Sequence, residues 1–316
     1  MEIRRSYSVE TAIPRLPKGP AEDLPLFESR SPEMSGLLET AARAAAGDAT
    51  ILLTGESGTG KDVLARQIHR WSARRERSFV VVNCTTLADQ GLESELFSHV
   101  RGAFSSAVDD RPGRFEAARG GTVFFDEIAE LEPPFQAQFL RFVQEHCFEP
   151  AGGDRAIGVD VRMIAASSRN LEDEVAAGRF REDLYYRLNV ITLRIPSLRD
   201  RIQDILPLAQ WMLRQARSRS AGREFTLSAD AAEAVVDYRS PGNIRELRNA
   251  LECAMTLAHT NTIALGDLPD SVRKAASGGF ISNGNGARLK EREREYISCA
   301  CSRRAAPSMR PPRFLG

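Results

Sequence analysis

The residues with the clearest chemistry form a glycine-rich stretch, Gly55-Glu56-Ser57-Gly58-Thr59-Gly60-Lys61-Asp62. An apolar run precedes it and an amphipathic segment follows, so we place it between a strand and a helix. Glycines let successive backbone N–H groups face phosphate oxygens, and a helix start adds partial positive charge. Lys61 is expected to reach the terminal phosphates. All eight residues are therefore candidate contacts for ATP.

The last residue of this loop departs from the general pattern. Asp62 stands where Ser or Thr usually holds Mg²⁺, and a carboxylate can serve the ion directly or through water. The alternative is a strand–helix turn that binds no ligand. Two glycines and a lysine at all the fixed spacings disfavour that alternative.

Two acids at the end of a second apolar run would complete the site. Asp126 and Glu127 follow Gly121–Phe125. We expect Asp126 to hold Mg²⁺ opposite Lys61 and Glu127 to orient and deprotonate the attacking water. Such an acid pair is a weak signal alone and gains weight beside the phosphate loop. A glutamate after the aspartate indicates hydrolysis.

Apolar runs alternate with helical patterns through the first two thirds of the chain. Nearly continuous runs of this kind predict strands buried on both faces, and their alternation with helices predicts a parallel sheet. The expected strands are Ala49–Thr54, Ser78–Cys84, Gly121–Phe125, Val161–Ala166 and Val190–Pro196. The expected helices are Ser31 to Gly47, Asp62–Ala73, Leu92–His99, Pro133–His146 and Leu171–Leu188.

After Pro196 the pattern becomes helical only. Ile202–Arg217, Ser228–Tyr238 and Asn243–His259 are amphipathic, with Ser228 as an expected N-cap. The fold class is thus α/β, a P-loop nucleotide-binding domain with a parallel sheet flanked by helices, followed by a small all-helical domain. The expected divisions are an irregular arm (1–27), the α/β domain (28–196), the helical lid (197–275), and a flexible linker and tail (276–316).

Composition limits the function classes. The 316 residues carry 43 Lys and Arg against 43 Asp and Glu, so no overall field draws the chain to nucleic acid or a membrane. No apolar run approaches the roughly 20 residues of a membrane span, and no signal peptide is visible. The five cysteines show no metal-site spacing and are interpreted as free thiols in a reducing compartment. We therefore expect a cytoplasmic protein without membrane contact.

Seven motifs in order resemble the central AAA+ domain of the NtrC family of sigma-54-dependent activators, from about Glu28 to Val272. They are Gly55–Asp62, Phe79–Cys84, Gly102–Ala107, Pro112–Glu116, Gly120–Glu127, Phe180–Leu188 and Ser240–Leu247. Gly102-Ala103-Phe104-Ser105-Ser106-Ala107 resembles the family's GAFTGA loop, which touches sigma-54. The resemblance implies an ATP- and Mg²⁺-dependent homo-oligomeric ring, a hexamer, that remodels sigma-54 RNA polymerase and so regulates transcription.

The resemblance also assigns roles that the residues alone would not. Arg181 and Arg187 match arginine fingers, and their spacing of six lets both project from one helical end. Without the family, pairing with Glu182 and Asp183 would be the better interpretation. Asn83 matches the glutamate switch, which hydrogen-bonds Glu127; a plain turn residue is the alternative.

Two further residues of the nucleotide site come from the same comparison. Ser168 lies in the first sensor segment and is expected near the phosphate end. Arg245 matches the second sensor, which contacts the nucleotide from the lid; by itself it would be interpreted as a solvated arginine.

Several positions depart from the family. Asp62 replaces Glu, Ser105-Ser106 replaces Thr-Gly, Ser168 replaces Asn and Ser240 replaces Trp. Ser106 adds a Cβ where glycine could take a positive φ, which costs about 1 kcal/mol if the loop needs that conformation. We expect ATP hydrolysis to survive this change and coupling to sigma-54 to weaken.

Both ends of the chain are short compared with the family. Only 27 residues precede the resemblance, so we expect no receiver domain. At the other end Arg288–Ile297 resembles the first helix of a Fis-type DNA-binding domain, and the prolines beyond it forbid the remaining helices. The basic excess of the whole segment from Arg288 to the end, eight Lys and Arg against three Glu, would bind promoter or enhancer DNA weakly and without sequence specificity. Composition favours a solvated or frame-shifted tail instead.

Two other functions stay open. One is a different AAA+ remodelling machine, such as a protein unfoldase or a helicase loader. The other is a truncated relative, uncoupled from transcription, that joins mixed rings or inhibits an intact activator. The intact Lys61, Asp126, Glu127 and both arginines argue against a dead ATPase.

Overall fold

Five parallel strands form the sheet in this computed structural model, which describes residues 29–87, 113–148, 156–217 and 223–278. They are β1 (Ile51–Thr54), β2 (Phe79–Asn83), β3 (Thr122–Asp126), β6 (Arg162–Ser167) and β7 (Ile191–Arg194), in the order β2-β3-β6-β1-β7. Every neighbouring pair is parallel. The five predicted strands are confirmed, with ends shifted by one or two residues. Because all strands run the same way, their carboxyl ends meet at one edge.

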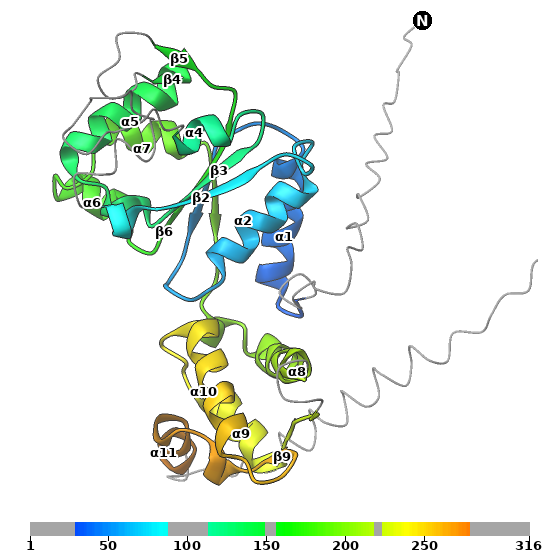
Figure 1. Ribbon diagram of the computed structural model, residues 1–316. Helices are drawn as coiled ribbons and strands as arrows, with labels where there is room; N and C mark the ends of the chain where they lie inside the picture. Colours follow the sequence, from blue (N-terminus) through cyan, green and yellow to red (C-terminus); the bar gives the residue numbers. More distant parts are fainter. Residues whose placement is uncertain (1–28, 88–112, 149–155, 218–222, 279–316) are drawn as a thin grey trace, which may run out of the picture.

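Helices cover both faces of the sheet (Figure 1). On one face lie α1 (Pro32–Ala45) and α2 (Lys61–Trp71). On the other lie α4 (Arg114–Ala117), α5 (Pro133–Glu145), α6 (Leu171–Ala176) and α7 (Glu182–Leu188). Successive strand residues alternate between the two cores: Phe124 packs on the α1 side, and Val123 and Phe125 pack on the α5 side. Burial on both faces explains why these strands are apolar throughout.

The predicted helix Leu171–Leu188 is wrong as a single element, because the chain breaks it into α6 and α7. Gly178 adopts a φ of 71°, and its N–H bonds to the carbonyl of Val175. The N–H of Arg179 bonds to the carbonyl of Glu174, which completes the Schellman motif that commonly ends a helix at a glycine. Buried Phe180 then anchors the link before α7 starts.

The lid is built from α8 (Ile205–Ala216), α9 (Ala229–Asp237), α10 (Asn243–Leu257) and α11 (Asp270–Gly278). The Ser228 hydroxyl accepts from the Ala231 N–H at 3.2 Å, so the predicted N-cap of α9 is confirmed. The helix α11 was not predicted, and it extends to Gly278 where the sequence suggested a linker from Ala276. The lid core is continuous with the core on the α1 side of the sheet.

Short elements connect these parts. Three-residue or four-residue 3₁₀ turns are η2 (Cys84–Leu87), η3 (Ile128–Glu130), η4 (Leu198–Asp200), η5 (Ile202–Asp204) and η6 (Leu265–Asp267). Two-residue strands pair as β4 (Cys147–Phe148) with β5 (Ile157–Gly158), and as β8 (Thr226–Leu227) with β9 (Thr262–Ile263). Elements this short leave no periodic pattern, and the sequence did not reveal them. The predicted helices Leu92–His99 and Arg288–Ile297 lie outside the described residues.

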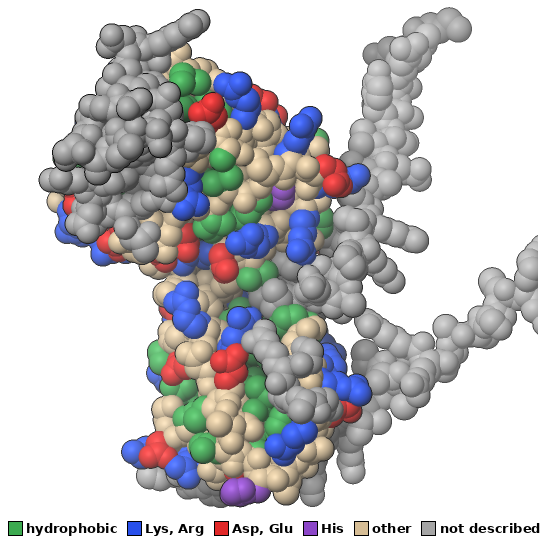
Figure 2. Space-filling view, in the orientation of Figure 1, with side chains coloured by type: hydrophobic (Ala, Val, Ile, Leu, Met, Phe, Trp, Pro, Cys, Tyr) green, Lys and Arg blue, Asp and Glu red, His purple; other side chains and the backbone are tan. Residues whose placement is uncertain are grey.

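The described surface mixes both signs of charge. Basic side chains are spread over the sheet domain and the lid with acidic ones among them (Figure 2). Cys84, Cys147 and Cys253 carry free thiols, and burial raises the pKa of Cys84. Across the described ranges, none of the helices has the length and apolar character needed to cross a bilayer.

Candidate nucleotide site

The carboxyl edge of the sheet gathers the residues that the sequence predicted to act together. The phosphate loop follows Thr54, the last residue of β1, and Thr54 lies beside Ser167 at the end of β6. Asn83 and Asp126 end β2 and β3 and lie opposite each other in the register. Parallel strands thus bring the loop, the acid pair, Asn83 and Ser168 to one place, although Thr54 and Ser168 are 114 positions apart in the sequence.

The phosphate loop needs its glycines for conformation and for space. Gly60 is the N-cap of α2 with a φ of 98°, a region that side chains with a Cβ avoid. Gly58 has a φ of 78°, and a Cβ there would lie 2.3 Å from the carbonyl oxygen of Gly242 in the lid. The loop therefore turns into the start of α2 while the lid backbone lies directly against it.

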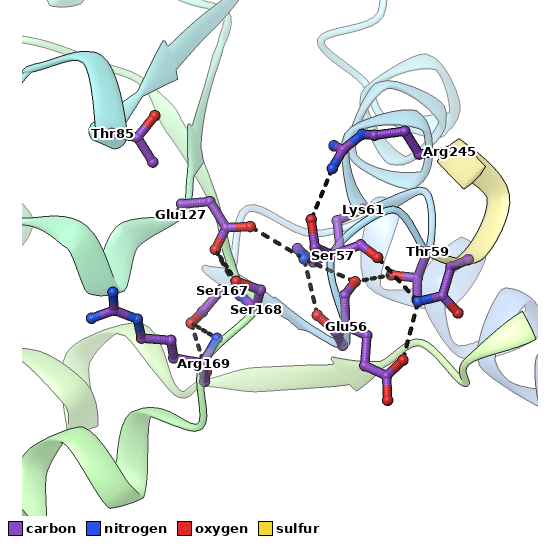
Figure 3. A network of polar contacts seen from close by, with 12 residues as sticks. Glu56, Ser57, Thr59, Lys61, Thr85, Glu127, Ser167, Ser168, Arg169 and Arg245 are labelled. Carbon is purple, nitrogen blue, oxygen red and sulfur yellow. Dashed lines mark hydrogen bonds and ion pairs between the residues drawn. The ribbon is translucent and has the colours of Figure 1, made fainter. Parts of the chain in front are cut away.

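The Lys61 side chain folds back onto the phosphate loop that carries it. Its side chain is only 5% exposed, and its Nζ donates to the carbonyls of Gly55 at 2.9 Å and Glu56 at 3.2 Å. The same Nζ is 3.5 Å from Oε1 of Glu127 (Figure 3). A buried ammonium needs partners, and loop carbonyls plus a carboxylate supply them here.

Glu127 is held at both carboxylate oxygens. Oε1 faces Lys61, and Oε2 accepts from the N–H of Ser168 at 2.8 Å and from its hydroxyl at 2.7 Å (Figure 3). Its backbone has φ 55° and ψ 54°, a left-handed conformation that costs on the order of 1 kcal/mol for a residue with a Cβ. Ser168 was predicted at the phosphate end; the structure brings it to Glu127.

Asp126 is a carboxylate in an unfavourable electrostatic position. Burial raises its pKa, and the neighbouring carboxylates of Glu127 and Asp62 raise it further, while Lys61 acts in the opposite direction. A divalent cation would relieve this repulsion. Within the described parts of the chain, no group of three His, Cys, Asp or Glu residues could hold a metal alone. Mg²⁺ needs less from a protein, because it is commonly bound by one or two carboxylates with phosphate oxygens and waters. Asp126 and Asp62 would supply the one or two carboxylates that such a Mg²⁺ site takes from the protein.

Asn83 shows the contacts of a turn residue. Its Oδ1 accepts from the N–H of Thr85 at 3.0 Å and from the Thr85 hydroxyl at 2.7 Å. This arrangement matches the simpler of the two interpretations of Asn83. A hydrogen bond from Asn83 to Glu127 stays a prediction.

The two candidate arginine fingers lie at opposite ends of α7, not at one end as the spacing suggested. Arg181 is the residue before the helix, and its N–H donates to Oε1 of buried Gln136 at 2.8 Å. Its guanidinium pairs with both oxygens of Asp183, at 3.0 and 2.7 Å. Arg187 lies in the last turn and is exposed. A seven-residue helix is about 10 Å long, which separates the two charges.

The lid reaches the loop through the start of α10. Nη1 of Arg245 donates to the Ser57 hydroxyl at 2.8 Å, so this predicted site residue does lie at the loop (Figure 3). The Ile244 N–H donates to the Gly58 carbonyl at 2.9 Å. Sequence reasoning missed three residues that also contact the loop: Asn243, and Arg199 and Arg201 in the connection before the lid. No spacing rule could have paired them with residues more than 140 positions away. The predicted sigma-54 loop, Gly102–Ala107, lies outside the described residues.

Comparison with known families decides the assignment. A sequence model of the Sigma-54 interaction domain matches residues 27–194, more than half of the chain, and one of the AAA+ ATPase lid domain matches residues 199–281. The chain belongs to the sigma-54 interaction domain family. Its parallel sheet with flanking helices and a following helical lid is the AAA+ fold.

Curated relatives agree with this family. The Nif-specific regulatory protein of Bradyrhizobium diazoefficiens is 49% identical over 237 residues, which cover 75% of this chain and 40% of that protein. The transcriptional regulatory protein ZraR of Klebsiella oxytoca is 41% identical, covering 100% of this chain and 72% of its own. The alginate regulator AlgB of Pseudomonas syringae is 44% identical over 85% of this chain and 59% of its own. The chain spans less than half the length of the Nif-specific regulators that it matches.

Solved structures show the same fold. NtrX from Brucella abortus in complex with ADP matches with a TM-score of 0.71 and 31% identity, over 83% of this chain and 58% of that one. NtrX in complex with ATP matches with a TM-score of 0.71 and 32% identity, over 81% of this chain and 56% of that one.

The raised pKa of Asp126 predicts a gain in stability when its charge is removed. The folded protein binds this proton more tightly than the unfolded chain, so the stabilising contribution is full below the ordinary pKa and is lost as pH rises through the raised one. Asp126→Asn should therefore raise the free energy of unfolding at neutral pH in metal-free buffer by about 1 kcal/mol, the usual scale for such relief.

Urea unfolding of both proteins from about pH 4, near the ordinary pKa of an aspartate, up to pH 7 measures this. Asp237→Asn, an exposed acid on α9, is the control and should leave the pH dependence unchanged. An Asp126→Asn protein no more stable than the wild type at pH 7 would refute the prediction.

Proposed function

We propose that this chain is a Mg²⁺-dependent ATP hydrolase that remodels sigma-54 RNA polymerase and thereby activates transcription. One observation carries the chemistry: Lys61 from the phosphate loop and Glu127 from the end of β3 approach within 3.5 Å, with the acidic Asp126 adjacent. Phosphoryl transfer needs a cation for the phosphates, acidic ligands for a metal and a separate base for water. These groups meet at one edge of the sheet.

The contacts suggest how the residues divide the work. Residues Gly55 to Asp62 would bind the triphosphate, and Asp126 and Asp62 would hold Mg²⁺, which would neutralise charge on the phosphates. Phosphate would take Lys61 from the loop carbonyls and from Glu127, which frees Oε1 of Glu127 to accept a proton from water. The N–H and hydroxyl of Ser168 keep hold of Oε2 and fix the direction of the carboxylate. Arg245 contacts the nucleotide from the lid.

A ring of identical subunits, a hexamer, completes the proposed site. Arg181 and Arg187 would face the nucleotide of a neighbouring subunit and stabilise charge in the transition state. Exposed apolar side chains support such a surface here, since Tyr186 in α7 is 67% exposed and Val190, two residues after the helix, is 59% exposed. Asn83 would respond to the state of Glu127, and Gly102–Ala107 would contact sigma-54. We place the protein in the cytoplasm, with any DNA contact weak and unspecific.

Replacing the proposed base should abolish turnover without abolishing binding. Glu127→Gln keeps the size of the side chain but cannot accept the proton, so ATP turnover should fall by about 100-fold or more. Phosphate release from the purified protein with ATP and Mg²⁺ measures turnover, and a fluorescent ATP analogue measures binding. Glu132→Gln, an exposed acid at the start of α5, should behave as the wild type. Equal rates for Glu127→Gln and the wild type would exclude the enzymatic role.

Coupling to transcription needs a separate measurement. Sigma-54 RNA polymerase on a matched promoter should form open complexes with this protein and ATP, detected by permanganate footprinting. Phe104→Ala should reduce opening to background and leave ATP turnover intact, because Phe104 belongs to the proposed sigma-54 contact. ATP turnover by the wild type without any opening would contradict the activator role. It would favour the uncoupled ATPase that Ser105-Ser106 suggests.

A further inference from the structure

Four successive residues of the phosphate loop contact the lid or the hinge that leads to it. We use hinge for Leu198–Arg201. The Glu56 carboxylate accepts from Arg199 and Asn243, and the Ser57 carbonyl accepts from Asn243 at 3.0 Å. The Gly58 carbonyl accepts from the Ile244 N–H at 2.9 Å, and the Thr59 carbonyl accepts from Nη2 of buried Arg201 at 3.0 Å. The loop is therefore held by residues of the hinge and the lid as well as by its own contacts.

Glu56 differs from the other three loop residues because its one side chain connects three segments, which are the loop, the hinge and the lid. Arg199 binds it through two guanidinium nitrogens, one of them at 2.9 Å from Oε2, and Nδ2 of Asn243 is 3.1 Å from the same oxygen. These partners lower the pKa of Glu56, Arg199 first and Asn243 second. The carboxylate thus stays ionised and ties the hinge and the lid to the loop at once.

Asn243 closes this network. It holds a left-handed φ of 54°, and its Oδ1 accepts from the Leu198 N–H at 2.8 Å while its Nδ2 binds Glu56. Hinge and lid are therefore connected to each other as well as to the loop. Arg245, two residues further, bonds to Ser57 from the same helix start.

We propose that Glu56 is a positioning residue, whose carboxylate seats the start of α10 on the phosphate loop through Arg199 and Asn243 and so presents Arg245 to the nucleotide. This role rests on the proposed ATP site and adds a specific link between that site and the lid. Two-pronged charge-assisted contacts are stronger than ordinary surface pairs, although Arg199 and Glu56 are each 42% exposed. Removing this ion pair should therefore have a moderate, measurable effect on how firmly the lid is seated on the loop.

Hydrogen exchange tests the link without relying on activity. The Ile244 amide reports lid seating, because it bonds across to Gly58. In nucleotide-free protein, Glu56→Gln and Arg199→Ala should each speed exchange of this amide by about fivefold, the scale of a charge-assisted pair at a partly exposed site. The double variant should exchange no faster than Glu56→Gln alone, because that substitution already removes the ion pair with Arg199. Asp270→Asn, which breaks the exposed pair with Arg273 in α11, should match the wild type.

Binding of a fluorescent ATP analogue supplies the second readout. Affinity should fall about fivefold in Glu56→Gln and in Arg199→Ala, and stay unchanged in Asp270→Asn. Wild-type exchange of the Ile244 amide in Glu56→Gln would overturn the proposal, as would additive effects in the double variant. A wild-type protein that binds no ATP would defeat the proposed function instead, while the exchange comparison would still decide the role of Glu56.

Discussion

The approach of the Lys61 ammonium to the Glu127 carboxylate is the interaction on which this site depends. The two groups come from different strands, because the loop that carries Lys61 follows β1 and Glu127 follows β3, with β6 between them. A nearly buried lysine and a strained glutamate are costly, and each offsets part of the cost of the other. Triphosphate would compete with Glu127 for this lysine, so its binding would free Glu127 to activate the water that attacks the terminal phosphate.

The residues around this edge of the sheet are held in energetically unfavourable positions. Asp126 has a raised pKa because burial and two neighbouring acids disfavour its charge. Such an arrangement lowers stability, and proteins retain it at sites where charge is needed. On the outer side, the lid backbone approaches Gly58 so closely that no side chain would fit there. The candidate nucleotide site is therefore formed by the carboxyl edge of the sheet and the lid together.

Sequence patterns predicted what depends on local order. The five strands were evident because burial on both faces makes each an unbroken apolar run, and the loop was evident from its spacing. Gly178 was missed as a helix stop because the segments on both sides of it are helical. The contacts of Glu56 with Arg199 and of Glu127 with Ser168 depend on tertiary placement, since 143 and 41 residues separate the partners. The family resemblance alone singled out Arg245, and its place at Ser57 agrees with it.

The most direct test of the account is a crystal structure of the Glu127→Gln protein with ATP and Mg²⁺. It should show Nζ of Lys61 released from the carbonyls of Gly55 and Glu56 and bound to the terminal phosphates. The metal should lie between those phosphates and Asp126. A nucleotide bound elsewhere, or a Lys61 that keeps its loop contacts while the triphosphate is present, would contradict the central claim.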